Sequence, residues 1–331
     1  MLNPEKIISR SLNEAEFTRY CLEVFHYQVK ENAVYKNWVD LIKHDISAVK
    51  HIQDIPFLPI ELFKTHKVVC TKDMEHGLIF TSSSTTSQIP SKHYVNHPEA
   101  YRLSFTRGFE FFYGDPKDYC ILALLPNYLS RQGSSLVYMF KHLIEQSAHA
   151  LSGFFLDDTR ELIRRINLLN KTPQKVLLLG VSYALLDLCE MGLDLGDNFI
   201  VMETGGMKGT RRELMKEELH NTLRSGLKAK HIHSEYGMTE LLSQAYSRNG
   251  NAFDTPPWMH FLIREIEDPF QLQSKNRSGG INAIDLANLY SCSFIATKDI
   301  GRITENGQLQ LLGRYDNSDV RGCNLMYGSE I

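Results

Sequence analysis

No apolar run in this 331-residue sequence is long enough to cross a membrane. The longest, such as residues 121–125, fall far short of the roughly 20 residues that a spanning helix needs. The first residues, MLNPEKIISRSLNEAEF, include acidic side chains and lack the apolar core of a secretory signal peptide. We therefore expect no membrane span and a cytoplasmic location.

Cysteine and net charge are also low. The six cysteines lie far apart and form no CxxC pair, and a chain of this length folds without disulfides, so free thiols in a reducing compartment are the plain interpretation. The 36 basic side chains nearly cancel the 39 acidic ones and leave a formal charge of −3. This balance gives no sign of a nucleic-acid or anionic-membrane partner.

What the sequence does contain is an alternation of short β-rich runs with helical segments. CILALLP, KVLLLG and NFIVMETGG are each followed by a helix-like stretch, namely SSLVYMFKHLIEQ, SYALLDLCEMG and TRRELMKEELHNTL. This alternation predicts buried parallel strands with right-handed crossovers, and hence an α/β fold of layered sheets and helices. Hydrophobic residues make up 43% of the chain, which is enough for an ordered core.

Three regions of the chain differ in character. Residues 1–75 are helical and aromatic-rich, with an apolar stretch over 55–68 whose two prolines favour an extended chain over a helix. Residues 76–250 carry the alternating pattern, and residues 251–331 change to short strands and turns. We expect an N-terminal region packed on the core, an α/β body, and a small β-rich subdomain.

The first polar motif is a hydroxyl-rich run after the strand-like LIFT. Such a turn offers N–H and O–H donors to phosphate oxygens, and a nearby lysine adds positive charge. A solvated surface loop is the alternative, and for the run taken alone it is the more frequent case. The candidate residues are Ser82, Ser83, Ser84, Thr85, Thr86 and Lys92.

The second motif, SEYGMTE, follows the strand-like AKHIHS. Gly237 permits close backbone approach, and Tyr236 presents a flat face to a planar ring. Thr239 can bind a phosphate oxygen, and Glu240 offers the hard oxygen ligand that Mg²⁺ prefers. The alternative is a strand-to-helix turn in which Thr239 and Glu240 only cap a helix.

The third motif places Asp299 on a turn after a strand, with Arg314 some residues later. A carboxylate in that position can accept both ribose hydroxyls, and an arginine can contact the same ribose or a phosphate. Ordinary β-turns and a surface arginine are the alternative.

Taken in order with ETGG at 203–206, these motifs resemble those of the adenylate-forming superfamily, which includes acyl-CoA synthetases and phenylacetate-CoA-ligase-type enzymes. The segments IPFLPIELFKTHKV, PSKHYV, LLPNYLSRQGSSLVYM and VRGCNL narrow the resemblance to the LuxE-like acyl-protein synthetases of bacterial bioluminescence operons. Those enzymes activate fatty acids within a fatty acid reductase complex. Relatives also occur in bacteria that emit no light, so the resemblance does not imply luminescence.

The resemblance implies ATP and Mg²⁺ as cofactors and an acyl-adenylate as product. The hydroxyl-rich loop would cradle the β- and γ-phosphates, and Gly205 and Gly206 would line the adenine pocket, with Tyr236 on the base. Thr239 would contact the α-phosphate and Glu240 would hold Mg²⁺.

The resemblance also assigns the ribose hydroxyls to Asp299, helped by Arg314. The polar residues Arg131, Ser134 and Ser135 lie beside the acyl pocket in the family. A helix N-terminus capped by serine explains the two serines equally well.

Two departures from the family pattern concern the loop and the end of the chain. Ser84 and Ser87 stand where the usual loop has glycine, and no lysine follows Lys298, whereas many relatives carry a mobile C-terminal lid with a catalytic lysine. We therefore expect a large N-terminal domain without that lid. In acyl-protein synthetases a cysteine near the C-terminus accepts the acyl group, and Cys323 occupies the matching place; a small buried thiol is the alternative.

The expected function is ATP-dependent activation of a carboxylic acid, a fatty acid by the resemblance, with transfer of the acyl group to Cys323 and then to a reductase-type partner protein. Two other classes stay open. One is an acid:CoA or acyl-carrier-protein ligase that releases a soluble thioester, and the other is a non-catalytic nucleotide-binding subunit.

Overall fold

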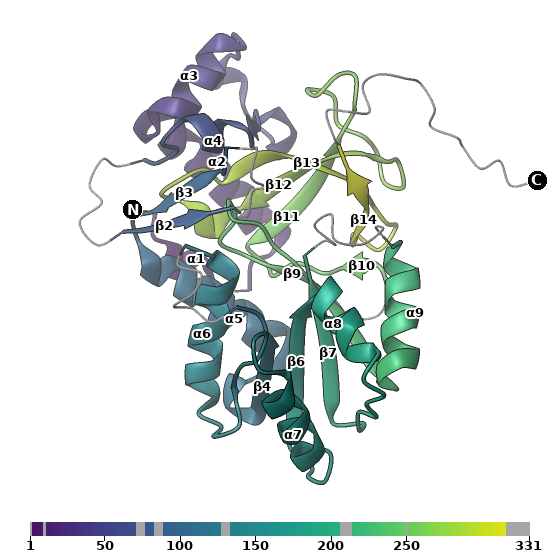
Figure 1. Ribbon diagram of the computed structural model, residues 1–331. Helices are drawn as coiled ribbons and strands as arrows, with labels where there is room; N and C mark the ends of the chain where they lie inside the picture. The colour runs from purple at the N-terminus through teal and green to yellow at the C-terminus, as the bar shows by residue number, and fades with distance from the viewer. Residues whose placement is uncertain are drawn as a thin grey trace, which may run out of the picture.

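The computed structural model describes residues 2–8, 11–70, 77–82, 89–126, 133–205, 214–248 and 250–315. Figure 1 shows a parallel sheet with its helices in the lower part of the molecule. A second sheet, flanked by N-terminal helices, occupies the upper part.

The parallel sheet has the strand order β5-β4-β6-β7-β8-β9, in which β9 runs antiparallel to β8 and the other described pairs are parallel. Every residue of β4 is buried, as expected for a strand that is covered on both faces. The parallel strands predicted from the alternating pattern are thus confirmed. The strands are β4 (Tyr119–Leu124), β5 (Gly153–Phe154), β6 (Lys175–Val181), β7 (Phe199–Thr204), β8 (His231–Tyr236) and β9 (Ala245–Ser247).

Helices cover both faces of this sheet. Within β7, Met202 packs into one hydrophobic core and Val201 into the other, which is the two-residue period of a strand. The first core also takes the buried side chains of α5 (Pro98–Tyr113) and α6 (Ser135–Ser147). The second core takes those of α7 (Thr159–Leu169), α8 (Ser182–Cys189) and α9 (Lys216–Leu227).

The second sheet has the order β10-β14-β13-β12-β11 and is antiparallel. A short strand from the N-terminal region, β1 (Leu58–Pro59), pairs in parallel with β13. The strands expected after residue 250 are therefore confirmed. They are β10 (Ala252–Phe253), β11 (Met259–Arg264), β12 (Gly279–Asp285), β13 (Phe294–Ile303) and β14 (Leu309–Arg314).

The N-terminal region is helical, as predicted, and its longest helix begins at a capping box between Asn13 and Glu16. The expectation of extended chain throughout 55–68 is wrong at one place, because one helical turn forms at α4 (Leu62–Thr65). The two prolines restrict only the residues next to them and leave this later turn unhindered. The other helices of this region are α1 (Pro4–Ile8), α2 (Glu14–Glu31) and α3 (Ala33–Leu41). The described residues also form the 3₁₀ turns η1 (Ile46–Ala48), η2 (Ile52–Asp54), η3 (Pro116–Asp118) and η4 (Leu286–Asn288).

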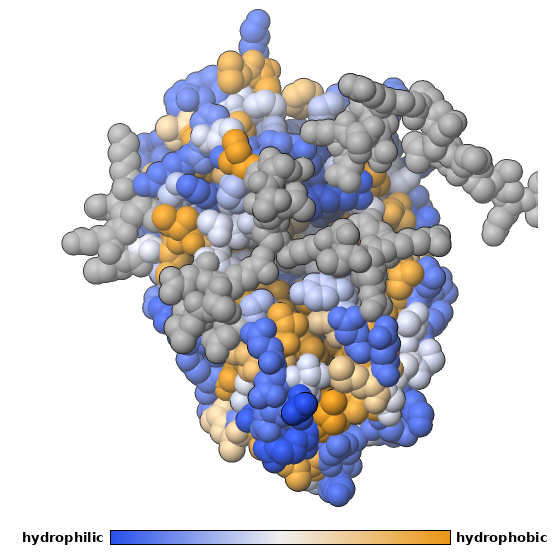
Figure 2. Space-filling view, in the orientation of Figure 1, coloured by the Kyte–Doolittle hydropathy of each residue, from blue (hydrophilic) through white to orange (hydrophobic). Residues whose placement is uncertain are grey.

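Large hydrophobic side chains that stay exposed are scattered along the described chain, from Leu41 to Leu312. The described part of the face in Figure 2 shows orange patches interspersed with blue and pale residues. Isolated exposed hydrophobic residues are normal on folded proteins. In the described part of the chain, no helix combines the length and the apolar character that crossing a membrane requires.

Candidate functional site

The segment after β8 carries the second sequence motif. Residues 237–244, all described by the structure, form turns rather than a helix, and the chain then enters β9. The alternative that Thr239 and Glu240 cap a helix is therefore wrong. Gly237 leaves room for the carboxyl group of Glu235, because a Cβ atom there would lie 2.6 Å from Oε1 of Glu235 and would have to displace it.

Glu240 is buried, with 6% of its surface exposed. Burial raises the pKa of this carboxyl group, and a hydrogen bond from Ser91 and the positive charge of Arg314 offset the rise only in part. A buried carboxylate whose charge is only partly compensated is a fitting ligand for Mg²⁺. Within the described ranges, no group of three His, Cys, Asp or Glu side chains is placed to hold a metal, and Glu240 as a Mg²⁺ ligand stays a prediction.

The hydroxyl-rich run lies on a hairpin of β2 (Leu78–Thr81) and β3 (Lys92–Val95). Ser82 closes the base of this hairpin: its N–H donates to the Ser91 carbonyl at 3.1 Å, and its Oγ accepts from the Ser91 N–H at 3.0 Å. Lys92 opens β3 and is exposed. The predicted phosphate-binding residues Ser83, Ser84, Thr85 and Thr86, and also Ser87, lie outside the described residues.

Asp299 was expected on a turn, and that expectation is wrong. The residue lies inside β13, because residues 299–303 pair with β14 in antiparallel fashion. The pairing register shifts once, between Ile300 and Gly301. The strand still brings Asp299 to the expected neighbours. Tyr236 donates its hydroxyl to Asp299 Oδ2 at 2.7 Å, and Arg314 Nε lies 3.7 Å from Asp299 Oδ1.

Tyr236 ends β8 and is 9% exposed. Its ring contacts Phe253 and Phe261 at centroid distances of 6.0 and 5.7 Å, each in an edge-on arrangement. The structure therefore places this ring where the parallel sheet meets the second sheet. Stacking of the ring on adenine stays a prediction.

The end of β7 carries the glycine motif on a buried polar network. Ser182 donates its hydroxyl to Glu203 Oε2 at 3.1 Å and to the Gly205 carbonyl at 2.8 Å. Burial alone would raise the pKa of Glu203, but the charge of Lys216 and hydrogen bonds from its neighbours lower it to about 2. Gly205 has a φ of +75°, a conformation that favours glycine. Gly206 lies outside the described residues.

Glu235 is a buried carboxyl group to which sequence reasoning gave no role. It lies beside Thr204 on the neighbouring parallel strand, and Thr204 donates its hydroxyl to Glu235 Oε2. Burial raises the pKa of Glu235 to about 7. The available signal was a pair of consecutive polar residues at the end of each strand, Glu203-Thr204 and Ser234-Glu235, which is also common outside functional sites.

The acyl-pocket candidates lie at the start of α6. Ser134 caps this helix, since its Oγ accepts from the Val137 N–H at 3.4 Å, and Ser135 is its first residue. The adjacent Gly133 carbonyl accepts from the Thr81 N–H at 2.8 Å, so this helix begins beside the end of β2. Arg131 lies outside the described residues. Capping explains Ser134, while a role beside the acyl chain stays a prediction.

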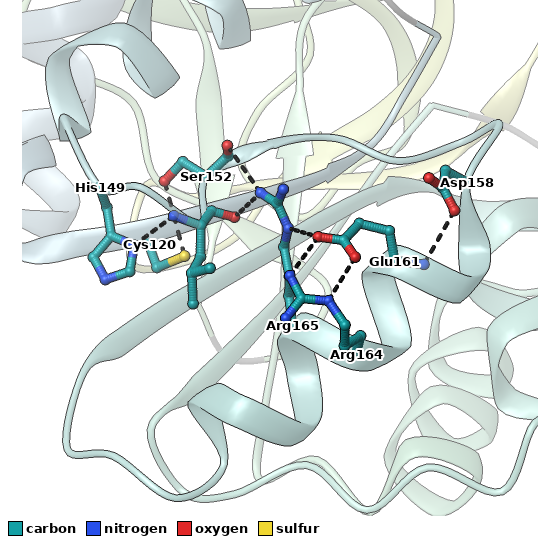
Figure 3. A network of polar contacts seen from close by, with 8 residues as sticks. Cys120, His149, Ser152, Asp158, Glu161, Arg164 and Arg165 are labelled. Carbon is teal, nitrogen blue, oxygen red and sulfur yellow. Dashed lines mark hydrogen bonds and ion pairs between the residues drawn. The ribbon is translucent and has the colours of Figure 1, made fainter.

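Cys323 also lies outside the described residues. Of the five described cysteines, Cys189 is partly exposed and the others are buried, and all five are free. Burial raises the pKa of Cys292 to about 12 and that of Cys120 to about 11, so both thiols are poor nucleophiles at neutral pH. Figure 3 shows Cys120 beside Ser152, near the start of β4 and thus away from the carboxyl ends of the parallel strands.

Solved structures share this fold. A 2-hydroxyisobutyryl-CoA ligase in an open conformation, in complex with 2-HIB-AMP and CoA, superposes with a TM-score of 0.69 at 11% identity, over 92% of this chain and 70% of that chain. ATP-bound MatB from Rhodopseudomonas palustris superposes with a TM-score of 0.54 at 16% identity, over 71% of this chain and 47% of that chain. The chain therefore has the α/β fold of the large N-terminal domain of adenylate-forming ligases.

A comparison with curated proteins gave no match. The family described as acyl-protein synthetase, LuxE, matches residues 7–331, which is nearly the whole chain. The match agrees with the order of motifs in the sequence and with the fold of the structure. This chain belongs to the LuxE acyl-protein synthetase family.

Proposed function

We propose that this protein uses ATP to activate a carboxylic acid, a fatty acid by family resemblance, and forms an acyl-adenylate and pyrophosphate. The observation that carries the proposal is the hydrogen-bond contact between His93 Nδ1, in β3 of the hydroxyl-rich hairpin, and the Thr239 carbonyl at 2.8 Å. It joins the hydroxyl-rich hairpin to the segment after β8. Tyr236, at the start of that segment, is bonded to Asp299, so three motifs that lie far apart in the sequence converge.

In this proposal the hydroxyl-rich loop and Lys92 bind the β- and γ-phosphates, and Thr239 binds the α-phosphate. Glu240 holds Mg²⁺, which when bound neutralises phosphate charge. The chain itself contributes positioning, because its hydroxyl and N–H donors hold the α-phosphorus in line with the attacking carboxylate. The loop residues assigned here are Ser82, Ser83, Ser84, Thr85 and Thr86.

The nucleoside part of ATP has its own set of proposed contacts. Asp299 accepts hydrogen bonds from the ribose hydroxyls, and Arg314 assists it. Tyr236 and the glycine turn after β7 line the adenine pocket. The acid lies near the start of α6, where Arg131, Ser134 and Ser135 are the candidate polar contacts.

The second half of the proposal is transfer of the acyl group to Cys323. The thiolate sulfur attacks the carbonyl carbon of the acyl-adenylate, a C–S bond forms, and the C–O bond to AMP breaks with AMP as leaving group. The resulting thioester is reactive enough to pass the acyl group to a reductase-type partner protein. The buried state of most described cysteines supports this choice, because a deeply buried thiol is a poor acceptor.

We further propose that residues 1–75, 76–250 and 251–331 act as the N-terminal region, the nucleotide- and acyl-binding body, and the β-rich subdomain. The first and third regions are joined by the parallel pairing of β1 with β13. The body meets the third region through the hydrogen bond from Tyr236 to Asp299.

The test measures ATP–pyrophosphate exchange with a panel of fatty acids in the presence of Mg²⁺, followed by mass spectrometry of the intact and digested protein. We expect exchange that depends on the acid and an acyl group on Cys323 that hydroxylamine removes. Cys323→Ser should keep the exchange and lose the label, with Cys189→Ser as the matched control that keeps both.

Other outcomes identify the other classes. Turnover with CoA or an acyl carrier that survives Cys323→Ser indicates a ligase that releases a soluble thioester. Binding of ATP without exchange for any acid indicates a non-catalytic nucleotide-binding subunit. A full acyl label on the Cys323→Ser variant contradicts the proposed acceptor.

A further inference from the structure

The turn around η4 holds the segment that contains Thr239 and Glu240. Asp285 Oδ2 accepts the backbone N–H groups of Leu242 at 2.7 Å and Ser243 at 2.9 Å. On the other side, Asn288 Nδ2 donates to the Glu240 carbonyl at 2.8 Å. The backbone on both sides of Leu241 is thus fixed by one turn that lies more than forty residues later in the sequence.

His93 completes this arrangement from the opposite side. It is the second residue of β3 and is fully buried, with its ring edge-on to Phe63 at 5.7 Å. Its Nδ1 lies 2.8 Å from the Thr239 carbonyl, and its Nε2 lies 3.1 Å from Asn288 Oδ1. One imidazole ring therefore connects the hydroxyl-rich hairpin, the segment after β8 and the η4 turn.

The bonds of Asn288 show why this ring is constrained. Both hydrogens of the Asn288 amide go to backbone carbonyls, those of Glu240 at 2.8 Å and Cys292 at 2.9 Å, which leaves its oxygen to face His93. The Thr239 carbonyl can only accept as well. Burial lowers the pKa of His93 to about 4, so the neutral ring has one N–H for two acceptors and donates to only one of them at a time.

The turn itself is anchored to the N-terminal helices. Gln28 of α2 is fully buried, and its Nε2 donates to the carbonyls of Asn288 at 3.1 Å and Leu289 at 2.8 Å. Its Oε1 accepts from the Ser293 N–H at 2.9 Å. The polar chain thus runs from α2 through the turn to His93 and Thr239.

We propose that His93 and Asn288 are positioning residues that set Thr239 and Glu240 against the hydroxyl-rich hairpin and so determine how tightly Mg·ATP binds. This inference rests on the proposed function, which assigns both motifs to the nucleotide. Neither side chain touches the nucleotide in this arrangement. Each acts through the backbone carbonyls of the two residues that do.

The experiment varies Mg·ATP at saturating acid, and acid at saturating Mg·ATP, in the pyrophosphate-exchange reaction. His93→Phe keeps a buried ring and removes both nitrogens, and Asn288→Ala removes the amide. We expect each change to raise the KM for Mg·ATP about fivefold, the effect of losing one hydrogen bond of average strength, and to leave the KM for the acid within about twofold. The double variant should lose less than the product of the two effects, because both residues belong to one network.

Val95→Ala is the matched control, since Val95 is buried in the same strand on the same face as His93 and packs in the hydrophobic core. It should lose stability without a change in the KM for Mg·ATP. An equal rise in that KM for Val95→Ala and His93→Phe overturns the proposal, because burial alone would then explain the effect.

A second readout needs no turnover: the rise in melting temperature caused by Mg·ATP, which reports binding by mass action. If Mg·ATP stabilises the wild-type protein but no exchange occurs, the proposed reaction is refuted. In that case, loss of the stabilisation in His93→Phe but not in Val95→Ala still supports the positioning role. A wild-type protein that shows neither exchange nor stabilisation overturns both proposals.

Discussion

Two buried glutamates at neighbouring strand ends differ in charge because their neighbours differ. Glu203 faces Lys216 and is held ionised, with a pKa of about 2, although burial opposes this. Glu235 lies on the next strand and receives a hydrogen bond from Thr204, but burial dominates and raises its pKa to about 7. The charge of Lys216, together with hydrogen bonds from Lys216, His220 and Ser234, accounts for the low pKa of Glu203.

Replacing Glu235 by glutamine should remove a pH dependence of stability. The folded-state pKa of Glu235 is raised, so its contribution to stability is fully present below the unfolded pKa of about 4.3 and is lost as pH rises through about 7. Glutamine is neutral at every pH. The free energy of unfolding of Glu235→Gln, relative to that of the wild type, should rise by on the order of 3 kcal/mol from pH 5 to pH 8. Urea unfolding of both proteins at the two pH values measures this change.

The control for this prediction is Glu161→Gln. The pKa of Glu161 is lowered to about 2 by hydrogen bonds from Arg164 and Arg165, so its contribution is lost only as pH falls below about 4. Glu161→Gln should therefore leave the difference in the free energy of unfolding between pH 5 and pH 8 as it is in the wild type. If the free energies of unfolding of Glu235→Gln and of the wild type change equally between pH 5 and pH 8, the carboxyl group of Glu235 is ionised in the folded state across this range.

At the scale of the element, α7 is fastened to the edge of the parallel sheet by one arginine. Figure 3 shows Arg165 between Glu161 of its own helix and the chain that leads into β5. Its Nε donates to Glu161 at 2.7 Å, and its Nη1 donates to the Leu151 carbonyl at 2.7 Å. The guanidinium carbon also lies 4.7 Å from the ring centroid of Phe155. Arg165 therefore joins a helix, a turn and an aromatic side chain.

We expect Arg165→Ala to lower the free energy of unfolding by about 1–2 kcal/mol, since it removes charge-assisted hydrogen bonds to backbone carbonyls and a cation–π contact. Arg164→Ala is the control, because Arg164 is 56% exposed and its side chain in Figure 3 donates to Glu161 alone. Exposed pairs of that kind contribute little. Chemical denaturation of both variants checks the prediction, and equal losses would contradict it.

Periodicity predicted the elements well and the local conformation of their ends less well. The runs that became β4, β6 and β7 were readable because a strand buried on both faces is continuously apolar. Asp299 was expected on a turn because aspartate and glycine are the most frequent turn residues, and Gly301 lies two positions later. It lies in β13 because pairing with β14 outweighs that local preference, and nothing in residues 297–302 alone reveals the partner strand.

At the scale of the molecule, the candidate site depends on contacts between distant parts of the chain. The structure brings Tyr236, Asp299 and Arg314 together, and the roles assigned to them from the sequence stay predictions. The residues that hold these motifs were not predictable. His93 and Asn288 are 195 positions apart. His93 lies in PSKHYV, a segment that carries the family resemblance but assigns no role to the histidine, and Asn288 lies in a stretch without a motif.

The hydrogen bond from Tyr236 to Asp299 links the parallel sheet to the second sheet, and its removal should destabilise the whole molecule. Tyr236→Phe keeps the ring contacts with Phe253 and deprives Asp299 of its hydroxyl donor, which leaves Arg314 at 3.7 Å as its charged partner. We expect a loss of about 1.5–3 kcal/mol in the free energy of unfolding, the usual range for a hydrogen bond to a charged group.

Tyr246→Phe provides the comparison that separates this bond from the general effect of losing a buried hydroxyl. Tyr246 is 1% exposed, and its hydroxyl has no hydrogen-bond partner among the described residues. Removing an unpartnered buried hydroxyl should leave stability unchanged or raise it, since the folded state no longer pays for its desolvation. Urea unfolding of the two variants under the same conditions should therefore give effects of different size, and of opposite sign if Tyr246→Phe is stabilising. Equal losses would mean that the sheets are held together by apolar packing around Tyr236 and that the bond to Asp299 contributes nothing measurable.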